Sequence, residues 1–169
     1  TWIVALVIAL VLVLVLLILG MRFIREYERA VIFRFGRLRK PRGPGPIYLI
    51  PGMDQMVRAD LRVITLTIPP QEVITRDNAV ILTNAIAFLK VTDPVKAVYG
   101  VTDFSEAIRN MIMTTLRSII GEMELDEALS SRDKIKARLR EMIADEAVDW
   151  GLTVKSVEIQ DIKPSESMQ

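Results

Sequence analysis

The chain has 169 residues, with 22 Lys and Arg, 21 Asp and Glu, and neither Cys nor His. Without Cys there is no disulfide framework, thiolate nucleophile or Cys-type zinc site, and without His there is no base for a Ser-His-Asp triad. The net charge of +1 gives no overall attraction to nucleic acid. All charged residues lie at or beyond Arg22, so an uncharged segment precedes a charge-balanced remainder.

That uncharged segment predicts a membrane-spanning helix over residues 1–21. Every residue from Trp2 to Leu19 is apolar, and Leu10 lies near the centre of this run. As a helix the run reaches about 27 Å, close to the ~30 Å hydrocarbon core of a bilayer. A cleaved signal peptide needs a basic start and small residues at its cleavage site, and a re-entrant hairpin needs a Pro or Gly break; neither pattern is visible. A buried core helix is rarely so uniformly apolar.

The flank that follows the predicted span is basic. Only Glu26 and Glu28 oppose eight cations, which are Arg22, Arg25, Arg29, Arg34, Arg37, Arg39, Lys40 and Arg42. By the positive-inside rule, we expect a single-pass protein of the cell membrane (inner or plasma membrane) whose large C-terminal part is cytoplasmic.

Strand signals dominate residues 22–92. Expected strands cover Arg29–Phe35, Leu61–Ile68 (ended by Pro69 and Pro70), Glu72–Thr75 and Ala79–Val91, the last two joined by a turn at Arg76–Asn78. Ala79–Val91 is apolar on both faces, which favours a central strand. Pro41–Pro46 is not expected to form regular structure, and the short apolar run Ile47–Pro51 follows it.

Helix signals begin at Asp93. Asp93 and Pro94 predict a short helix ending near Gly100, and Asp103 with Glu106 begins a longer helix that Gly121 ends. A helical turn is expected at Asp126–Leu129, followed by a helix from Ser130 or Ser131 to about Trp150. The predicted buried stripes are Ile108, Met111, Ile112, Leu116, Ile119 and Ile120 in one helix, and Ile135, Leu139, Met142, Ile143 and Ala147 in the other.

A final strand is expected after Gly151. It covers Leu152–Ile162, and a phase shift between Val154 and Val157 indicates a bulge or two covered faces. The residues from Lys163 to Glu166 resemble the start of another helix, which we expect to be cut at Gln169. The fold class is therefore α+β. Its parts are a span (1–21), a strand-rich half (22–92), a helix-rich half (93–162) and a truncated helix (163–169).

Several blocks in order resemble the stomatin domain. They are Glu28–Leu38 (ERAVIFRFGRL), Gly43–Pro46 with Ile50-Pro51, Asp60–Arg62, Ile68–Val73, Thr75–Asn78, Thr114–Arg117, Ile120-Gly121, Ser131–Asp133, Trp150-Gly151 and Val157–Ile162. From Arg22 onward the chain is similar to a prokaryotic stomatin of the stomatin/prohibitin/flotillin/HflK superfamily (SPFH or band 7). Animal stomatins have a Pro-bent hairpin and palmitoylated Cys, both of which a straight span replaces here.

The resemblance implies a membrane-anchored scaffold and not an enzyme. Members form homo-oligomeric rings or cages, joined by a coiled-coil segment that would follow Gln169, and they organise membrane microdomains and partner membrane proteins. The alternative is a regulatory subunit or substrate of a membrane-bound protease, such as the NfeD type. No catalytic, cofactor or metal residue is expected, and neither is a nucleic-acid partner.

For two groups of residues, the sequence leaves open whether they contact the membrane. The basic cluster and its neighbours are assigned to membrane-surface contact, as Arg22, Arg25, Arg37, Arg39, Lys40, Arg42, Tyr48 and Leu49. For the basic residues, the alternative to anionic headgroups is a solvated edge strand. For the apolar run Ile47–Pro51, with Met53 and Met56, the alternatives are packing beneath the sheet or a shallow dip into the leaflet.

Three further patterns have ordinary explanations. Ser131 and Lys134 match S-x-x-K, but the Ser is expected to be a helix N-cap, which leaves a Ser/Lys hydrolase the less favoured hypothesis. The loop with Gly43 and Gly45 lacks donors for a phosphate cradle, since Pro44 and Pro46 have no N–H. The carboxylates Glu122, Glu124, Asp126 and Glu127 favour a solvated loop or pairing with a neighbouring subunit over a cation site. The proposed subunit contacts are Glu124 with Arg109, Arg117 or Arg132.

Overall fold

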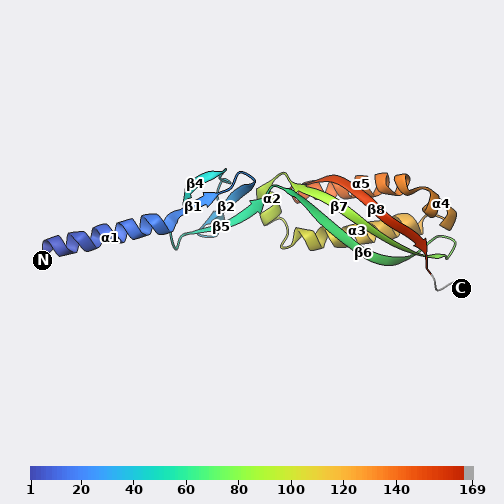
Figure 1. Ribbon diagram of the computed structural model, residues 1–169, viewed down its shortest axis with the longest axis horizontal. Helices are drawn as coiled ribbons and strands as arrows, with labels where there is room; N and C mark the ends of the chain where they lie inside the picture. Colours follow the sequence, from blue (N-terminus) through green and yellow to red (C-terminus); the bar gives the residue numbers. More distant parts are fainter. Residues whose placement is uncertain (166–169) are drawn as a thin grey trace. The chain divides into compact units, whose positions relative to one another are not determined.

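The computed structural model describes residues 1–165 and has the expected α+β architecture (Figure 1). The chain forms two compact units, Thr1–Leu61 and the part from Arg62 onward. The change from strands to helices that the sequence shows at Asp93 therefore falls inside the second unit, and the division between the units lies earlier, between Leu61 and Arg62.

The first unit begins with the apolar helix α1 (Trp2–Gly20), as predicted. Every side chain from Trp2 to Leu19 is exposed, and Gly20 is the helix's only buried residue. Met21 does not extend the helix, because it begins strand β1 (Met21–Ile24). A helix of 19 residues whose apolar side chains are all exposed is long and apolar enough to cross a membrane.

Two small antiparallel sheets complete this unit. Strand β1 pairs with β4 (Gly45–Tyr48), and β2 (Glu28–Arg34) lies between β3 (Arg37–Leu38) and β5 (Asp54–Asp60). Their shared core is a cluster of four buried residues, Ile24, Ala30, Ile32 and Ile47. So small a core makes the polar contacts around it important for this unit's stability.

Strand β4 corrects two expectations about residues 41–51. Gly45 and Pro46 were expected to be irregular, yet they open β4, where Pro46 lies opposite Phe23. The pairing is possible because β1 and β4 form a two-stranded ribbon, in which a residue without an N–H can face away from its partner. The run Ile47–Pro51 consequently begins in a strand and not in a loop.

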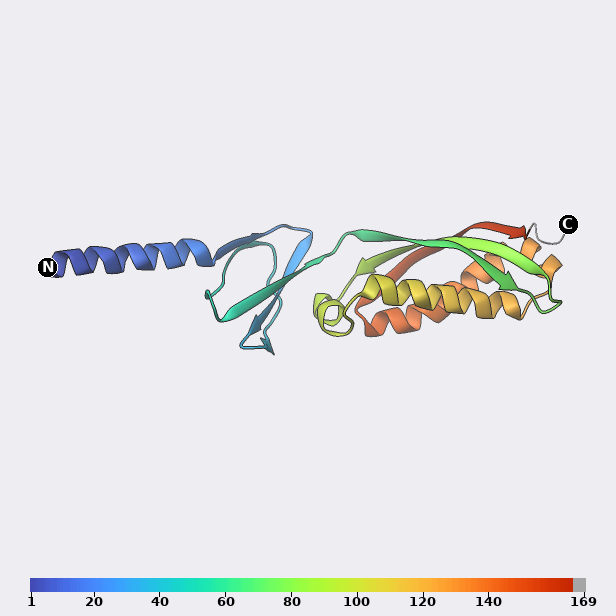
Figure 2. The ribbon, with the colours of Figure 1, turned by 90° about the horizontal axis from the view of Figure 1, so that it is seen from below.

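The second unit contains one antiparallel sheet in the order β6–β7–β8, formed by Val63–Ile74, Val80–Val91 and Leu152–Pro164. The central position of β7 and its hairpin with β6 are as predicted. Alternate β7 residues are buried and partly exposed, because helices cover one face (Figure 2).

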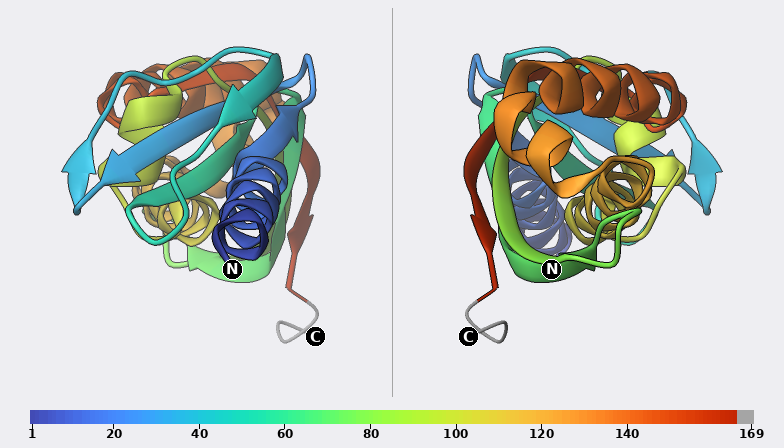
Figure 3. Two further views of the ribbon diagram at one scale, coloured as in Figure 1. Left: turned by 90° about the vertical axis from the view of Figure 1, so that its left-hand side faces the viewer. Right: turned by 90° about the vertical axis from the view of Figure 1, so that its right-hand side faces the viewer.

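Four helices follow β7: α2 (Pro94–Tyr99), α3 (Phe104–Gly121), α4 (Leu125–Ser130) and α5 (Arg132–Asp149). Helices α3 and α5 pack on each other and on the sheet, and the end-on views of Figure 3 show them on the same side of it. The predicted caps are confirmed, since Asp93 Oδ1 accepts from Val95 and Lys96 N–H, and Asp103 Oδ1 from Ser105 and Glu106 N–H.

Both predicted stripes lie in the core with two exceptions. The α3 stripe is buried apart from the half-buried Met111, and in α5 Ile135, Leu139, Ile143 and Ala147 are fully buried. The prediction that Met142 is buried is wrong, because this side chain is 46% exposed. At position 142 the helix has already turned away from the line through 135, 139 and 143, so its neighbour Ile143 takes the core position.

The strand ends differ from the sequence prediction at three prolines. Pro69 and Pro70 were expected to end a strand, but β6 continues to Ile74 through a register shift between Ile68 and Gln71. Pro164 of β8 lies opposite Ile81 of β7, so the strand continues through Lys163 and no helix begins there. Glu166, the last residue of the expected helix start, lies outside the described residues. Both β6 and β8 are edge strands, where Pro is tolerated. Of the two explanations offered for the phase shift in β8, a bulge or two covered faces, the register shift beside Lys155 supports the bulge.

Candidate functional site

The membrane helix joins the small sheets through a close contact at Gly20. A Cβ on Gly20 would overlap the Tyr48 ring and the Leu49 carbonyl oxygen, so only glycine fits here. The Leu49 N–H donates to the Gly20 carbonyl at 2.7 Å. Gly20 therefore lets β4 pack directly on the end of α1.

The apolar run after this junction divides between core and surface. Ile47 is 7% exposed in the core cluster and Leu49 packs against that cluster, whereas Tyr48 is 49% exposed. Alternation along an extended segment causes this split, since neighbouring side chains point to opposite faces. Of the two open interpretations, core packing accounts for Ile47, Leu49 and Met56, whereas Tyr48, Pro51 and Met53 are exposed and remain available for contact outside the unit.

Close to the span, the basic side chains line an open cleft of about 420 Å³. Arg39, Lys40 and Arg42 come from the segment after β3, and Arg34 and Asp54 from β2 and β5; Ile32 and Tyr48 complete the lining. Four cations and one carboxylate give the cleft a net charge of +3. Within residues 1–165, the side chains of Arg39, Lys40 and Arg42 form no hydrogen bond or ion pair.

A buried ion pair stabilises one wall of this cleft. Arg34 Nε and Nη2 donate to the two carboxylate oxygens of Asp54 at 2.7 and 2.9 Å, and the Ile50 N–H donates to Asp54 Oδ2 at 3.0 Å. The Asp54 side chain is 1% exposed. The Arg34 hydrogen bond, followed by that from Ile50, lowers the pKa of Asp54 to about 2 and keeps the carboxylate ionised. Because its oxygens are occupied, Asp54 does not form an ion pair with the other cations.

The other residues predicted to contact the membrane surface are spread around the same unit. Arg22 lies in β1 and Arg37 in β3, both exposed. Arg25 donates to the Tyr27 hydroxyl at 2.5 Å and lies over its ring. None of these three lines the cleft, so the structure brings together only Arg39, Lys40, Arg42 and Tyr48 from the predicted set.

An apolar groove of about 530 Å³ is also lined by Tyr48. Leu14, Leu17, Ile18 and Met21 line it from one face of α1 and its end, and Phe23 and Tyr48 line it from β1 and β4. The spacing of three and four residues places the α1 side chains in one row. Tyr48 thus lines both the basic cleft and the apolar groove.

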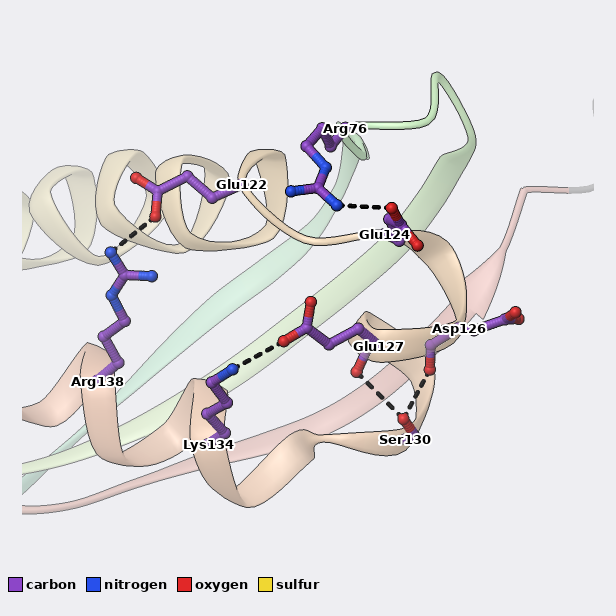
Figure 4. A network of polar contacts seen from close by, with 8 residues as sticks. All are labelled: Arg76, Glu122, Glu124, Asp126, Glu127, Ser130, Lys134 and Arg138. Carbon is purple, nitrogen blue, oxygen red and sulfur yellow. Dashed lines mark hydrogen bonds and ion pairs between the residues drawn. The ribbon is translucent and has the colours of Figure 1, made fainter.

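In the second unit, the predicted carboxylate cluster forms ion pairs within the chain (Figure 4). Glu122 pairs with Arg138, Glu124 with Arg76 and Glu127 with Lys134, at 2.7, 2.5 and 2.7 Å. The hydrogen bond from Lys134 lowers the pKa of Glu127. The Asp126 side chain points away from these ion pairs (Figure 4), and the Asp126 backbone carbonyl accepts a hydrogen bond from the Ser130 hydroxyl. No group of metal-ligating side chains occurs among residues 1–165.

The three arginines proposed to meet Glu124 of a neighbouring copy lie on α3 and α5. Arg109 and Arg117 are in α3 and Arg132 is the first residue of α5. Arg117 donates weakly to Gln71 Oε1 at 3.5 Å, and Arg109 and Arg132 form no ion pair with any described residue. Glu124 remains 59% exposed although it pairs with Arg76. Contact with another subunit therefore stays a prediction for all four residues.

Ser131 and Lys134 do not form the constellation of a Ser/Lys hydrolase. Ser131 is the N-cap residue of α5, although its side chain makes no capping hydrogen bond. Lys134 is 63% exposed and ion-paired with Glu127, so it lacks the dry pocket that such a base requires. Gly43 is exposed and Gly45 is partly exposed, and both lie beside prolines that have no N–H to donate.

Sequence reasoning missed Asp54 and the double role of Tyr48. Asp54 and Arg34 belong to different segments of the chain, and only the β2–β5 register places the two opposite each other. The one available signal in the sequence was that Asp54 is a single acidic residue among basic and apolar neighbours. The contact of Tyr48 with Gly20 depends on the path of the whole hairpin, which no local pattern encodes.

Comparison with known proteins agrees with this architecture. Residues 22–169 match the model of the SPFH domain / Band 7 family. A stomatin homolog of Pyrococcus horikoshii is 46% identical over 151 residues, which are 89% of this chain and 56% of that protein. Stomatin-1 of Caenorhabditis elegans is 37% identical, over 88% of this chain and 46% of that protein. Mouse stomatin is 36% identical, over 85% of this chain and 51% of that protein.

The apolar helix and the α+β domain define a candidate membrane-anchored module. The chain belongs to the SPFH domain / Band 7 family, and within it the chain is a stomatin-like protein of the prokaryotic kind. It spans about half the length of several of the curated relatives that it matches.

Proposed function

We propose that this protein is a membrane-anchored scaffold, many copies of which assemble into a closed ring or cage and organise lipids and membrane proteins within it. The observation that carries the proposal is the fully exposed apolar helix α1, joined without a linker to a small basic unit. Exposed apolar surface of this extent calls for a membrane, because a soluble fold would bury it. Membership of the stomatin-like proteins supports the scaffold role.

Orientation follows from charge. The cations beyond Gly20 lie in the same unit as the span, and three of them are unpaired within residues 1–165. Such cations remain on the cytoplasmic side during insertion and gain about 1 kcal/mol each near an anionic leaflet. We therefore place the domain in the cytoplasm.

The orientation has a direct test, because the chain contains no Cys. A single Tyr99→Cys variant offers a thiol at a position that is 76% exposed. A membrane-impermeant maleimide should label it only after the cells are permeabilised. Labelling in intact cells would contradict the proposed topology.

Lateral contact is assigned to the exposed pair of Arg76 and Glu124, with Arg109, Arg117 or Arg132 of a neighbouring copy as the second partner of Glu124. Heterologous contacts of this kind close into rings when the rotation between copies allows it. Many weak contacts, each acting on copies already held in one plane, then give a stable assembly by avidity.

A double charge reversal separates this role from the internal ion pair. Arg76→Glu with Glu124→Arg keeps an opposite-charge pair inside the chain but inverts the charge offered to a neighbour. Assembly of the full-length protein, measured by mass photometry in detergent, should weaken. The matched control reverses Lys136 and Glu158, which also pair on the surface at 2.6 Å. Unchanged assembly in the first variant would remove Glu124 from the interface.

No enzymatic step enters the proposal. A regulatory subunit or substrate of a membrane-bound protease is the alternative, and purification of the full-length protein from its native membrane tests it. Recovery of a protease in stoichiometric amount would replace the scaffold by this alternative, whereas homo-oligomers without it support the scaffold.

A further inference from the structure

The first unit carries two neighbouring cavities of opposite character. The basic cleft has a net charge of +3, and the apolar groove is lined by Leu14, Leu17, Ile18, Met21 and Phe23. Tyr48 lines both, so the two cavities share this residue. A ligand that occupied both would need an anionic end and an apolar end.

The groove runs along the last two turns of α1. Leu14 to Met21 covers about 10 Å at ~1.5 Å per residue, roughly the upper half of a lipid acyl chain. Because α1 is about as long as the hydrocarbon core is thick, its end at Gly20 lies at the level where acyl chains give way to headgroups. Tyr48, packed on Gly20, then lies at the depth preferred by interfacial aromatic residues.

The cleft begins where a headgroup would begin. Arg39, Lys40 and Arg42 face it without an ion pair among residues 1–165, since the carboxylate of Asp54 is taken up by Arg34 and the Ile50 N–H. Three like charges around one cavity repel one another, and a phosphate group relieves that repulsion by charge-assisted hydrogen bonds. A cavity of about 420 Å³ suits one small headgroup and not a polymer.

We propose that each chain binds one anionic phospholipid, with its phosphate in the cleft formed by Arg39, Lys40 and Arg42 and one acyl chain in the groove along α1. The inference rests on the proposed membrane anchoring and deepens it, because it names the lipid class that the anchor selects. Tyr48 separates the polar and apolar parts of the site and positions the glycerol region between them.

The site predicts selective and saturable lipid binding. The full chain, purified in a non-ionic detergent, is titrated with dioleoyl phosphatidylglycerol or dioleoyl phosphatidylcholine, and native mass spectrometry counts the lipids bound. The chains of these lipids are identical, so a difference in affinity reports the headgroup. We expect one phosphatidylglycerol per chain, bound about ten-fold more tightly than phosphatidylcholine. Equal affinities, or progressive binding without a first saturable site, would overturn the proposal.

Matched variants distinguish the cleft from general electrostatics. R39Q/K40Q/R42Q removes the three cleft cations, and K96Q/R140Q/K155Q removes three exposed cations of the second unit that pair with no described residue. Both variants lose the same charge. The preference for phosphatidylglycerol should fall to less than about three-fold in the first variant and persist in the second. An equal loss in both would show a delocalised charge effect and contradict a discrete site.

Two soluble probes test whether a lipid, and not free phosphate, is the ligand. Inorganic phosphate and glycerophosphoglycerol carry the anionic group without acyl chains. Each should bind at least about 100-fold more weakly than phosphatidylglycerol, because the groove contributes nothing to them. Comparable affinity for either probe would refute the lipid assignment. Alkaline extraction of membranes tests the anchor separately: a retained protein without lipid selectivity refutes this site and leaves the anchor intact.

Discussion

Gly151 joins α5 to β8 in a way that only glycine permits. Its φ of +71° lies in the left-handed region, and a Cβ there would overlap the carbonyl oxygen of Asp93 and approach Lys96 Cβ to 2.8 Å. Its own carbonyl accepts hydrogen bonds from the N–H groups of Thr92 and Asp93, at 2.8 and 3.0 Å. One residue thus ends a helix, starts a strand and holds the end of β7.

Gly151→Ala should therefore destabilise the second unit by about 2–4 kcal/mol. A left-handed Ala costs roughly 1–2 kcal/mol. The backbone must also move to relieve the overlap with Asp93, which weakens two hydrogen bonds of about 1 kcal/mol each. For a unit of this size we expect the midpoint of thermal unfolding to fall by roughly 10–20 °C.

The adjacent Trp150 provides the signal. Unfolding of the full chain in detergent is followed by tryptophan fluorescence in a Trp2→Phe background, which leaves Trp150 as the only tryptophan. Gly121→Ala is the matched control, because a Cβ at this helical position would lie at an ordinary 3.7 Å from the Ile74 carbonyl oxygen. It should stabilise by up to about 1 kcal/mol. A loss below about 1 kcal/mol for Gly151→Ala, or similar effects at both glycines, would refute the reasoning.

The remaining predictions concern the core, the junction and pH. Leu139→Ala, at a fully buried position of α5, should cost about 2–5 kcal/mol in the same assay, and a loss typical of surface sites would mean that α5 is not packed as described. Ile47→Asp should unfold the first unit, as measured by circular dichroism. Tyr48→Asp should leave the unit folded but reduce the protection of its amide hydrogens from exchange when liposomes are present. Unfolding by both variants would contradict the division between core and surface. Because the pKa of Asp54 is lowered to about 2, below the ~3.9 of an unfolded Asp, its ionised form stabilises the fold above about pH 4, and this contribution is lost as the pH falls toward 2. In the wild type, the β2 amides should lose protection from hydrogen exchange as the pH falls from about 4 to about 2. Asp54→Asn should make this pH dependence weaker, and an unchanged pH dependence would count against the ion pair.

Local signals explain what the sequence predicted well. Asp93 and Asp103 cap their helices through bonds to residues two and three positions ahead, so the pattern alone contains the partners. The hairpin between β6 and β7 likewise depends on three adjacent turn residues. The apolar leader needs only its own composition.

Sheet position explains the corrections. Pro69 and Pro70 would stop a central strand, but β6 is an edge strand and absorbs them in a register shift. Pro164 is similarly tolerated within β8, opposite Ile81 of β7, because β8 is an edge strand with one unpaired side. Which strand lies at an edge depends on pairings between segments far apart in the chain, such as β7 with β8, which a local pattern does not contain.

The candidate site was predictable in its chemistry but not in its geometry. The basic flank beyond the span marked Arg39, Lys40 and Arg42 as membrane-facing residues. The structure adds that Asp54 is already paired with Arg34, which leaves those three cations unpaired among residues 1–165, and that Tyr48 connects their cleft with the groove on α1. The first fact follows from the β2–β5 register, and the second from the path of the chain that brings Tyr48 against Gly20.

The proposed scaffold requires that many copies of this chain assemble on a membrane. Single-particle imaging of the full-length protein, extracted from its membrane with native lipid, tests it most directly. The scaffold account predicts closed rings or cages of identical subunits, with their apolar helices gathered in one lipid layer. A population of monomers under these conditions would contradict it.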